Sequence, residues 1–295
     1  MEPLLRVCIS ADYPAKPGVL KEVAFCVDPG EIVGLAGESG SGKSTVALAI
    51  LGLLGYKNGV ARGEISFNGR NLLALPNKEW RQVRGREIGL VLQSPLLSLN
   101  PALKLGSAMA EAWRAHSPSP NQWREQAIET FRLVSLANGE ELLNRYPREL
   151  SVGQAQRALI AMAILHRPKL LIADEATSAL DAITQCEILQ LFRGLSQTLG
   201  MSLLFISHDL LSLASLCHRV AILQNGVLVE CGKTGQVFAR PVHPYTQALL
   251  RALPRLPEAA GGALAALARQ LQTSSEILQE RGMESAPKVS EGQTL

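Results

Sequence analysis

Short apolar runs of strand length alternate with longer runs of helical periodicity along most of the chain. The short runs that predict β-strands cover residues 5–9, 23–27, 31–36, 63–67, 88–92, 169–173, 202–206, 219–223 and 227–230. Longer runs predict helices over residues 44–54, 155–165 and 184–199. A turn through Pro14 and Gly18, and Asn-Gly pairs at 68–69 and 225–226, predict connections between neighbouring strands. This alternation predicts an α/β fold.

Two stretches depart from the alternation. From Pro95 to about Leu165 the pattern is helical, which predicts a helical insertion in the α/β domain. Residues 258–281 are rich in Ala, Leu, Gln and Glu, and their leucines have the spacing of a short amphipathic helix. We interpret this helix as a packing helix in preference to a partner-binding helix. The composition of residues 283–295 predicts a disordered tail.

Composition narrows the classes of protein. With 295 residues, 47% of them hydrophobic, the chain exceeds a single compact core, so a domain with a subdomain or two domains are expected. The net charge of +3 is spread along the chain, so nucleic-acid binding is not expected. The five cysteines never have CxxC spacing, which predicts neither a disulfide framework nor a zinc site and fits a reducing compartment.

The N-terminal residues do not have the pattern of a targeting segment. Residues 1–6 lack a basic segment followed by an apolar core. No run approaches the roughly 18 apolar residues that a membrane span needs. We therefore expect a soluble, cytoplasmic chain that acts at a membrane only through partners.

Residues 37–45 carry the strongest chemical signal. Gly-Glu-Ser-Gly-Ser-Gly-Lys-Ser-Thr fits the phosphate-loop pattern GxxxxGK[ST] and stands between a predicted strand and a predicted helix. The glycines let successive N–H groups face one anion, and the helix N-terminus adds about half a positive charge. Lys43 is expected to reach the β- and γ-phosphates, and the Ser44 hydroxyl to ligate Mg²⁺. A Gly/Ser-rich turn without a ligand would leave this lysine and hydroxyl without a packing purpose.

Polar residues directly after apolar strands form a second group of candidates. Asp174 and Glu175 place two carboxylates at the carboxyl edge of a predicted parallel sheet, where ligands bind. Such a pair is costly to bury without a cation or a proton to transfer. Gln93 follows the strand over 88–92, and His208 follows the strand over 202–206. For His208 the alternative is a satisfied core histidine.

Two further positions have a local reading. Ser151 stands three residues before Gln154 at the head of a predicted helix, which is the pattern of a capping box. Tyr13 lies thirty residues before Lys43 in an otherwise polar turn. Its ring has the chemistry to stack on an adenine, and a tyrosine that only plugs a strand end is the open alternative.

Taken in order, these residues form a known set. The set comprises Gly37–Thr45, Gln93, Leu150–Gln154, Asp174-Glu175, Ser178–Asp181 and Ser207–Asp209. It resembles the nucleotide-binding subunit of an ABC transporter over roughly residues 4–256. The resemblance implies a P-loop NTPase (ABC ATPase) fold with a RecA-like parallel-sheet core, an antiparallel β subdomain and a helical subdomain. The implied domains are an ABC ATPase domain over 1–256, its helical subdomain over about 95–165, and a C-terminal helix and tail over 257–295.

Two stretches indicate a branch of this family. Residues 93–101, QSPLLSLNP, are similar to the segment QDPMTSLNP, and residues 243–250 to the HPYT element, of the ATPases of oligopeptide, dipeptide and nickel importers. Many members of that branch carry a cysteine cluster for an iron–sulfur centre after the position of Pro254–Leu256. Here no cysteine follows Cys231, so that cofactor is not expected.

Val152 is a second departure from the family pattern. It replaces the first glycine of the family signature LSGGQ. We expect Val152 to adopt ordinary helical or extended backbone angles at the start of its helix.

The resemblance assigns roles for ATP and Mg²⁺. Lys43 would hold the phosphates together with loop residues Gly37, Ser39, Gly40, Ser41, Gly42, Ser44 and Thr45. Ser44 and Gln93 would ligate Mg²⁺, and Asp174 would act on the metal through water. Glu175 would be the general base, and His208 would contact the γ-phosphate and keep the water aligned. Gln93 also begins the loop that faces the membrane subunits in this family.

The same resemblance implies an assembly in which two ATP molecules lie between two subunits. Ser151, Gly153 and Gln154 would face the partner's nucleotide, and Asp181 would couple the two sites. The expected partners are a second ABC ATPase in a hetero- or homodimer, two integral membrane permease subunits and, indirectly, a solute-binding protein, without nucleic acid. The chain would power an importer of peptides or of nickel or metal-complex solutes from the inner face of the cell membrane.

Two other classes are less consistent with the motifs. A soluble mechanical ATPase of the same superfamily, not coupled to transport, would need basic extensions or two fused cassettes. A small-molecule P-loop kinase would leave residues 150–154 and 178–181 without a purpose. The motifs name neither the cargo nor the direction of transport.

Overall fold

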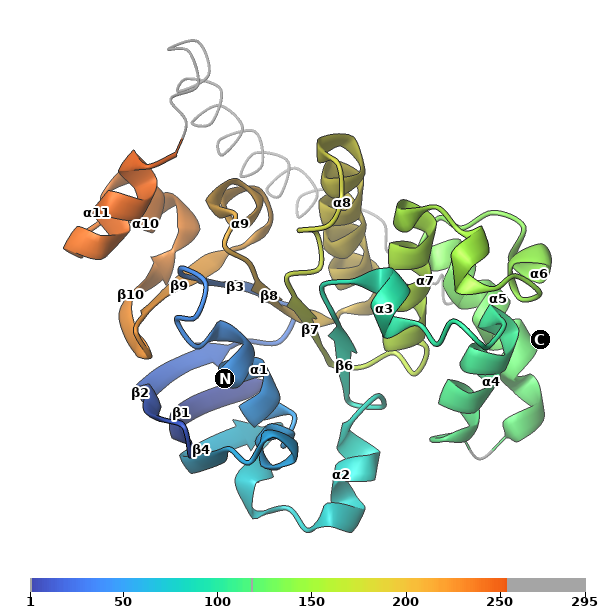
Figure 1. Cartoon of the computed structure of the whole chain (residues 1–295), viewed down its shortest axis with the longest axis horizontal. Coiled ribbons are helices and arrows are strands. Elements are labelled where there is room, and N and C mark those ends of the chain that lie inside the picture. The colour runs from blue at the N-terminus through green and yellow to red at the C-terminus, as the bar shows by residue number, and fades with distance from the viewer. Residues whose placement is uncertain (1, 118, 254–295) are drawn as a thin grey trace, which may run out of the picture. The chain divides into compact units, whose positions relative to one another are not determined.

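Two β-sheets organise the computed structural model, which describes residues 2–117 and 119–253 (Figure 1). The six-stranded sheet has the order β10 (Val227–Lys233), β9 (Arg219–Gln224), β3 (Ile32–Ala36), β8 (Ser202–Ile206), β7 (Leu170–Asp174) and β6 (Ile88–Val91). Its strands from β9 to β6 pair in parallel, and β10 pairs antiparallel with β9. The four-stranded antiparallel sheet has the order β2 (Lys16–Val27), β1 (Leu5–Tyr13), β4 (Val60–Phe67) and β5 (Arg70–Asn71).

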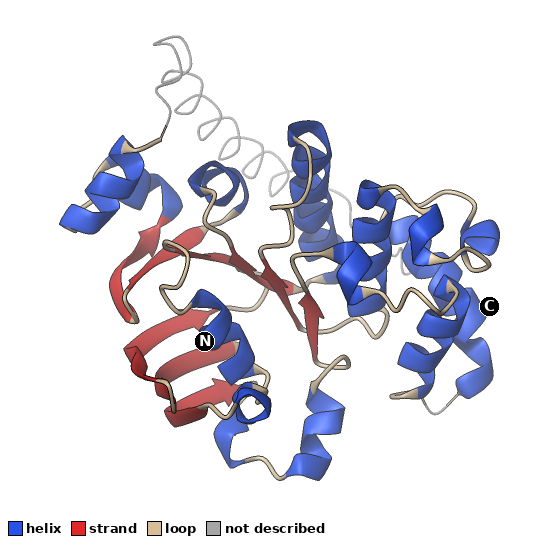
Figure 2. Cartoon of the chain, viewed as in Figure 1, coloured by secondary structure: helices blue, strands red, loops and turns tan. Residues whose placement is uncertain are grey.

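Helix α1 (Lys43–Ile50) packs against strands of both sheets (Figure 2). Its buried residues Val46 and Ile50 belong to one apolar cluster with Leu35 of β3 and with Val7 and Ile65 of the antiparallel sheet. Burial of such side chains is the main source of folding free energy. The helix that follows the candidate phosphate loop is therefore held in place by the core itself.

Helices α8 (Ala182–Leu199) and α9 (Leu210–Leu216) cover the other face of the six-stranded sheet. Side chains alternate between faces along a strand, so Gly34 points away from the face that carries Leu35. A Cβ on Gly34 would lie 2.5 Å from Leu213 of α9, which shows how closely this helix approaches β3. On the same face, the ring of Phe205 meets Phe192 of α8 edge to face at 6.0 Å.

Among the described residues, five α-helices lie between β6 and β7 in the chain and gather beyond the β6 edge of the sheet (Figure 1). They are α3 (Pro95–Ser98), α4 (Leu105–Arg114), α5 (Trp123–Leu133), α6 (Gly139–Leu142) and α7 (Val152–Ile164). Helix α7 contacts α3, α4 and α5, and it also contacts β6. The helical character predicted for 95–165 is present, and the subdomain boundaries stay a prediction.

The remaining elements are short. They are helices α2 (Asn77–Val83), α10 (Thr234–Ala239) and α11 (Pro244–Arg251), and 3₁₀ turns at Leu54–Lys57, Leu72–Ala74, Pro120–Gln122 and Pro147–Glu149. Within the described residues, no helix combines the length and the apolar composition that a membrane-spanning segment requires.

Each predicted strand is present, but several predicted bounds were wrong. The helix predicted over 44–54 ends at Ile50, because Gly52 has a left-handed φ of 61° and a Cβ there would lie 2.4 Å from the ring of Trp80. The turn predicted through Gly18 is shorter, since β2 begins at Lys16. The helix and tail predicted over 258–281 and 283–295 lie outside the described residues.

The turn between β9 and β10 joins two distant parts of the fold. Asn225 and Gly226 both have positive φ, 48° and 79°, as a two-residue type I′ turn requires. The N–H of Gly226 donates to the carbonyl oxygen of Ser41 at 3.0 Å, and its own carbonyl accepts from the N–H of Lys21 at 2.7 Å. The turn thus connects the segment after β3 to strand β2.

We expect Gly226→Ala to destabilise the protein more than Gly30→Ala. Both glycines have left-handed φ, 79° and 72°, so alanine costs about 1–2 kcal/mol at either position. A Cβ on Gly226 would lie 2.2 Å from the carbonyl oxygen of Val19, whereas a Cβ on Gly30 meets nothing within 4 Å. The clash adds about 1–3 kcal/mol. Urea unfolding of both variants measures the difference, and equal losses would contradict this account of the turn.

Candidate functional site

The segment Gly37–Thr45, called the phosphate loop below, connects β3 to α1 through three glycines with positive φ. Gly37, Gly40 and Gly42 have φ of 151°, 79° and 111°, and Gly42 is the N-cap of α1. A Cβ on Gly37 would lie 2.2 Å from the carbonyl oxygen of Leu223, and a Cβ on Gly42 would lie 2.7 Å from Leu20. Close packing therefore excludes other residues at these two glycines. Around Gly40 a Cβ would meet nothing within 4 Å, so this part of the loop is open.

The polar side chains of the loop divide into exposed and buried groups. Ser39 and Ser44 are exposed, while Ser41 and Thr45 are buried. The hydroxyl oxygen of Ser41 has no hydrogen-bond partner among the described residues. The loop therefore retains a free hydrogen-bonding group. Burying such a group without a partner costs folding free energy.

Lys43 is folded back into the loop that it belongs to. Its buried ammonium donates to the carbonyl oxygens of Gly37 at 2.8 Å and of Glu38 at 3.0 Å, and lies 3.9 Å from a carboxylate oxygen of Glu175. Burial lowers the pKa of Lys43, and the carboxylates of Glu175 and Asp174 act in the opposite direction. The ammonium therefore lies between the backbone of the loop and the two carboxylates.

Asp174 ends β7 with a carboxylate that is only partly satisfied. Its Oδ1 atom is buried and has no hydrogen-bond partner among the described residues. Burial raises the pKa of Asp174, while a hydrogen bond from the Ser44 hydroxyl lowers it. A carboxylate oxygen with spare capacity beside a hydroxyl suits a hard divalent cation, which prefers oxygen ligands. In the described part of the chain, no three His, Cys, Asp or Glu side chains are grouped to hold a metal ion by themselves.

Glu175 has a strained backbone conformation. Its φ is 53°, in the left-handed region that costs a residue with a side chain about 1–3 kcal/mol. The conformation is held by a hydrogen bond from its N–H to the carbonyl oxygen of Ile206 at 2.9 Å, and by Ser178, whose hydroxyl donates to the Glu175 carbonyl at 3.0 Å. Its side chain is 14% exposed, and its carboxylate contacts His208 Nδ1 at 2.7 Å. One side chain thus contacts both Lys43 and His208.

Parallel pairing explains why these residues meet. Asp174 is in register with Ile206, so Glu175 lies beside the segment that carries His208. Val91 is in register with Ala173, so the exposed Gln93 follows at the same sheet edge. The phosphate loop follows β3 at that edge. The predicted candidates from four strands therefore share the carboxyl edge of one sheet, where ligands bind in open α/β folds.

A second group of candidates lies at the N-termini of α7 and α8. Ser151 caps α7 in the predicted capping box, with Gln154 N donating to Ser151 Oγ at 3.2 Å and Ser151 N to Gln154 Oε1 at 3.1 Å. Asp181 caps α8, and hydrogen bonds from the side chain and backbone of Thr184 lower its pKa. A Cβ on Gly153 would lie 3.0 Å from Thr184, so the two helix starts are adjacent.

Val152 is the first residue of α7, lies outside the left-handed region and is 42% exposed. The expectation of ordinary backbone angles is confirmed. The replacement of glycine therefore causes no backbone strain at this position.

Tyr13 lies at the end of β1 that is nearer to the phosphate loop. Leu20, which approaches Gly42, is in register with Ala11, two residues before Tyr13. The ring of Tyr13 is half-buried and lies so close to Gly59 that a Cβ there would be 2.6 Å away. One part of the ring thus packs against Gly59, and the side chain as a whole stays partly exposed.

Sequence reasoning missed a contact between the phosphate loop and the C-terminal part of the described chain. The hydroxyl of Tyr245, at the start of α11, accepts a hydrogen bond from the N–H of Glu38 at 3.1 Å. The HPYT similarity drew attention to this segment but gave no partner for it.

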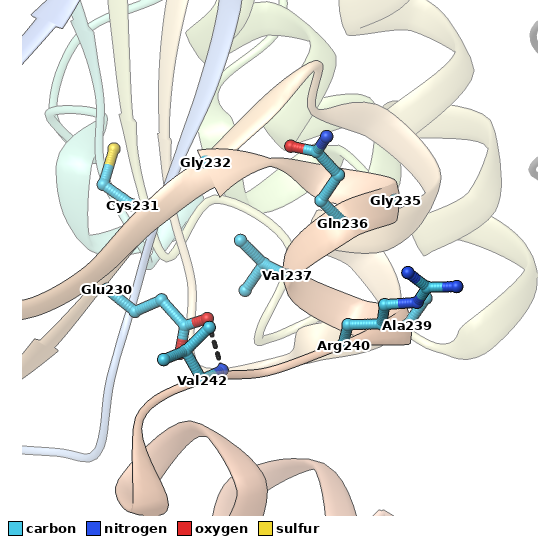
Figure 3. Close-up of a pocket in the computed structure, with 9 residues that line it drawn as sticks. All are labelled: Glu230, Cys231, Gly232, Gly235, Gln236, Val237, Ala239, Arg240 and Val242. Carbon is cyan, nitrogen blue, oxygen red and sulfur yellow. Dashed lines mark hydrogen bonds between the residues drawn. The ribbon is translucent and has the colours of Figure 1, made fainter.

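A separate cavity of about 500 Å³ lies between β10 and α10 and is lined by Cys231, Gln236 and Arg240 among others (Figure 3). It contains none of the predicted site residues.

Comparisons with known proteins agree with this geometry. A family described as "ABC transporter" matches residues 20–178, and one described as "Oligopeptide/dipeptide transporter, C-terminal region" matches residues 229–279. A probable peptide ABC transporter ATP-binding protein of Sinorhizobium fredii is 45% identical, covering 81% of this chain and 74% of the relative. The dipeptide transport ATP-binding protein DppD of Escherichia coli is 43% identical (84% and 76% covered), and the oligopeptide transport ATP-binding protein OppD of Bacillus subtilis 42% (83% and 69%).

Solved structures show the same fold. A dimeric ATP-binding cassette in a post-hydrolysis state with ADP and phosphate matches with a TM-score of 0.67 and 27% identity, covering 78% of this chain and 98% of that one. The cbiO1 protein of Clostridium perfringens matches with a TM-score of 0.72 and 24% identity, covering 86% and 97%. The chain belongs to the ATP-binding subunits of ABC transporters. It is thus an α/β P-loop NTPase that binds ATP and couples ATP hydrolysis to transport.

Proposed function

We propose that the chain is the ATP-hydrolysing subunit of a peptide importer, with Glu175 as its catalytic base. The observation that carries the proposal is the position of Glu175, which contacts Lys43 of the phosphate loop at 3.9 Å and His208 at 2.7 Å. Peptides are favoured over nickel or metal-complex solutes because the relatives described above are named for peptide, dipeptide and oligopeptide transport.

The phosphate loop and Lys43 bind the phosphates of ATP. Backbone N–H groups at the start of α1 and the ammonium of Lys43 supply positive charge. The unpartnered hydroxyl of Ser41 adds a donor. Ser39, next to the open Gly40, is exposed and therefore accessible to an incoming nucleotide.

The Ser44 hydroxyl, the Gln93 amide oxygen and, through water, Asp174 would hold Mg²⁺. The donors fit, because all are oxygens and the buried Oδ1 of Asp174 has no other partner among the described residues. When bound, the ion neutralises negative charge on the phosphates. These three residues orient it.

Glu175 accepts a proton from the attacking water. As the water oxygen forms its bond to the γ-phosphorus, the bond to the ADP oxygen breaks, and that oxygen keeps the electron pair. The strained backbone and the His208 contact hold the carboxylate in one orientation. In this proposal His208, whose side chain is 60% exposed, contacts the γ-phosphate through its other ring nitrogen.

The helix starts around Ser151 and Asp181 complete the site of a second subunit. Ser151, Gly153 and Gln154 face the phosphate loop of the partner, and Asp181 links the two sites. Exposure of Val152 and Ile183, 42% and 75%, supports an interface here. The partner is a second ABC ATPase in a heterodimer, which two permeases and a solute-binding protein complete at the inner face of the cell membrane.

Glu175→Gln should bind ATP but hydrolyse it about 10²- to 10⁴-fold more slowly, because glutamine cannot accept the proton. It should also trap a nucleotide-bound dimer. The measurements are ATP turnover and peptide uptake by the chain assembled with its permeases in vesicles, and chromatography with ATP. The control is Glu64→Gln, a substitution at an exposed glutamate on β4, which should retain turnover.

Near-normal hydrolysis by Glu175→Gln would remove Glu175 from the role of base. Uptake of nickel complexes without uptake of peptides would contradict the proposal that peptides are the transported solute.

Tyr13→Ala should weaken ATP binding by about 1–3 kcal/mol if the ring stacks on the adenine, whereas Tyr13→Trp should be tolerated. Calorimetric titration with ATP measures the affinity. Thermal unfolding of the same samples measures any loss of stability from the missing packing of the ring on Gly59, so that this loss can be distinguished from a loss of ATP binding. Tyr56→Ala, at a tyrosine 82% exposed, is the matched control. Equal affinity in wild type and Tyr13→Ala would leave the ring with a packing role only.

Val152→Gly should change turnover of the assembled complex only slightly, because Val152 already has an ordinary helical backbone. An unchanged turnover would mean that both ATP sites of the complex are active. ATP hydrolysis of the variant is compared with wild type in the same membranes. A rise of tenfold or more, about 1.4 kcal/mol in barrier, would mark this half of the site as degenerate.

A further inference from the structure

One peptide group of the phosphate loop is held from two opposite sides. The carbonyl oxygen of Gly37 accepts from Lys43 Nζ at 2.8 Å, and the N–H of Glu38, in the same peptide, donates to the hydroxyl of Tyr245 at 3.1 Å. In a trans peptide these two groups point in opposite directions in one plane. The two hydrogen bonds together therefore determine how this plane is oriented.

The peptide needs such a restraint because of its neighbours in the chain. Gly37, whose φ is 151°, lacks a Cβ, so its backbone is restricted less than that of other residues. Glu38 is exposed. If the N–H were released, the plane could rotate and carry away the carbonyl that contacts Lys43. Tyr245 thus acts on Lys43 through one peptide group.

The segment that carries Tyr245 is itself anchored to β10. The two carboxylate oxygens of Glu230 accept from the N–H groups of Val242 at 2.9 Å and His243 at 3.0 Å. Nδ1 of His243 then accepts from the N–H of Tyr245 at 3.2 Å. Thr246, next to Tyr245, is 1% exposed. Hydrogen bonds through His243 and Tyr245 therefore link Glu230 to Glu38.

We propose that Tyr245 is a positioning residue that holds the phosphate loop in its ATP-binding form, and that Glu230 fixes Tyr245 for this purpose. The proposal rests on the proposed function, because it assumes that this loop binds ATP. It gives a role to residues 229–251, which lie in the region matched by the oligopeptide/dipeptide transporter C-terminal family. That region then makes the conformation of the phosphate loop depend on the position of α11.

The test uses the full chain and the variant Tyr245→Phe, which keeps the ring and removes only the hydroxyl. Two quantities are measured: the dissociation constant for ATP by calorimetry, and the hydrogen exchange rate of the Glu38 amide. Tyr245→Phe should raise the dissociation constant about threefold to tenfold, the effect of one lost hydrogen bond. The Glu38 amide should exchange faster without nucleotide. Tyr56→Phe, at an exposed tyrosine, should change neither quantity.

A second variant, Glu230→Gln, separates a positioning role from general packing. It should weaken ATP binding in the wild-type background and have little further effect in Tyr245→Phe, because residues in one hydrogen-bond network are not additive. In the assembled transporter, the effect of Tyr245→Phe should fall on KM more than on kcat.

Each result decides between the proposals. If wild type binds ATP and Tyr245→Phe binds it equally well with unchanged exchange at Glu38, the role of Tyr245 is overturned and the proposed function stands. Additive effects of the two variants would overturn the link through Glu230. Failure of wild type to bind ATP would overturn both the proposed function and this inference.

Discussion

Parallel pairing of β3, β8, β7 and β6 determines where the chemistry of this chain takes place. The side chains of these strands are almost all buried, so the register is set by the core. Polar residues follow directly after the carboxyl end of each strand, where the chain leaves the core. A shift of one residue in any strand would exchange its side chains between two faces that are both closely packed, so fitted contacts such as that of Gly34 with Leu213 would be lost. The same constraint that stabilises the sheet therefore aligns the phosphate loop, the two carboxylates, His208 and Gln93 at one edge.

Several features of the site oppose folding. Glu175 has a left-handed backbone, and Asp174 Oδ1 and Ser41 Oγ are buried without hydrogen-bond partners among the described residues. Lys43 uses backbone carbonyls of its own loop as partners. Such groups lower the stability of a protein and are retained where a ligand uses them. Their position at one sheet edge, together with the strained backbone of Glu175, supports a functional role for this edge.

Local signals predicted most of this arrangement. The apolar runs gave every strand of the parallel sheet, because burial on both faces leaves a continuous hydrophobic pattern. Asn225-Gly226 gave the type I′ turn, and Ser151 with Gln154 gave the capping box, since both depend on residues a few positions apart. These features need no knowledge of the tertiary structure.

Contacts between distant residues were not predictable in this way. Gly52 ends α1 against Trp80, and Tyr245 bonds to Glu38 across 207 positions. The strained φ of Glu175 depends on a hydrogen bond to Ile206 in another strand. In each case the partner is chosen by the packing of the whole domain. The ring of Tyr13 shows the same limit, because its packing on Gly59 depends on how β1 pairs with β4.

The turn at Gly226, which bonds to both Ser41 and Lys21, has a consequence for the entropy of ligand binding. A free glycine-rich loop would lose much conformational freedom on closing around a phosphate, and that loss would weaken the complex. Here folding has already restricted the loop, so less freedom remains to be lost when the nucleotide arrives. Loop order and global stability then become thermodynamically linked, and a nucleotide that binds only the folded state protects this chain against unfolding.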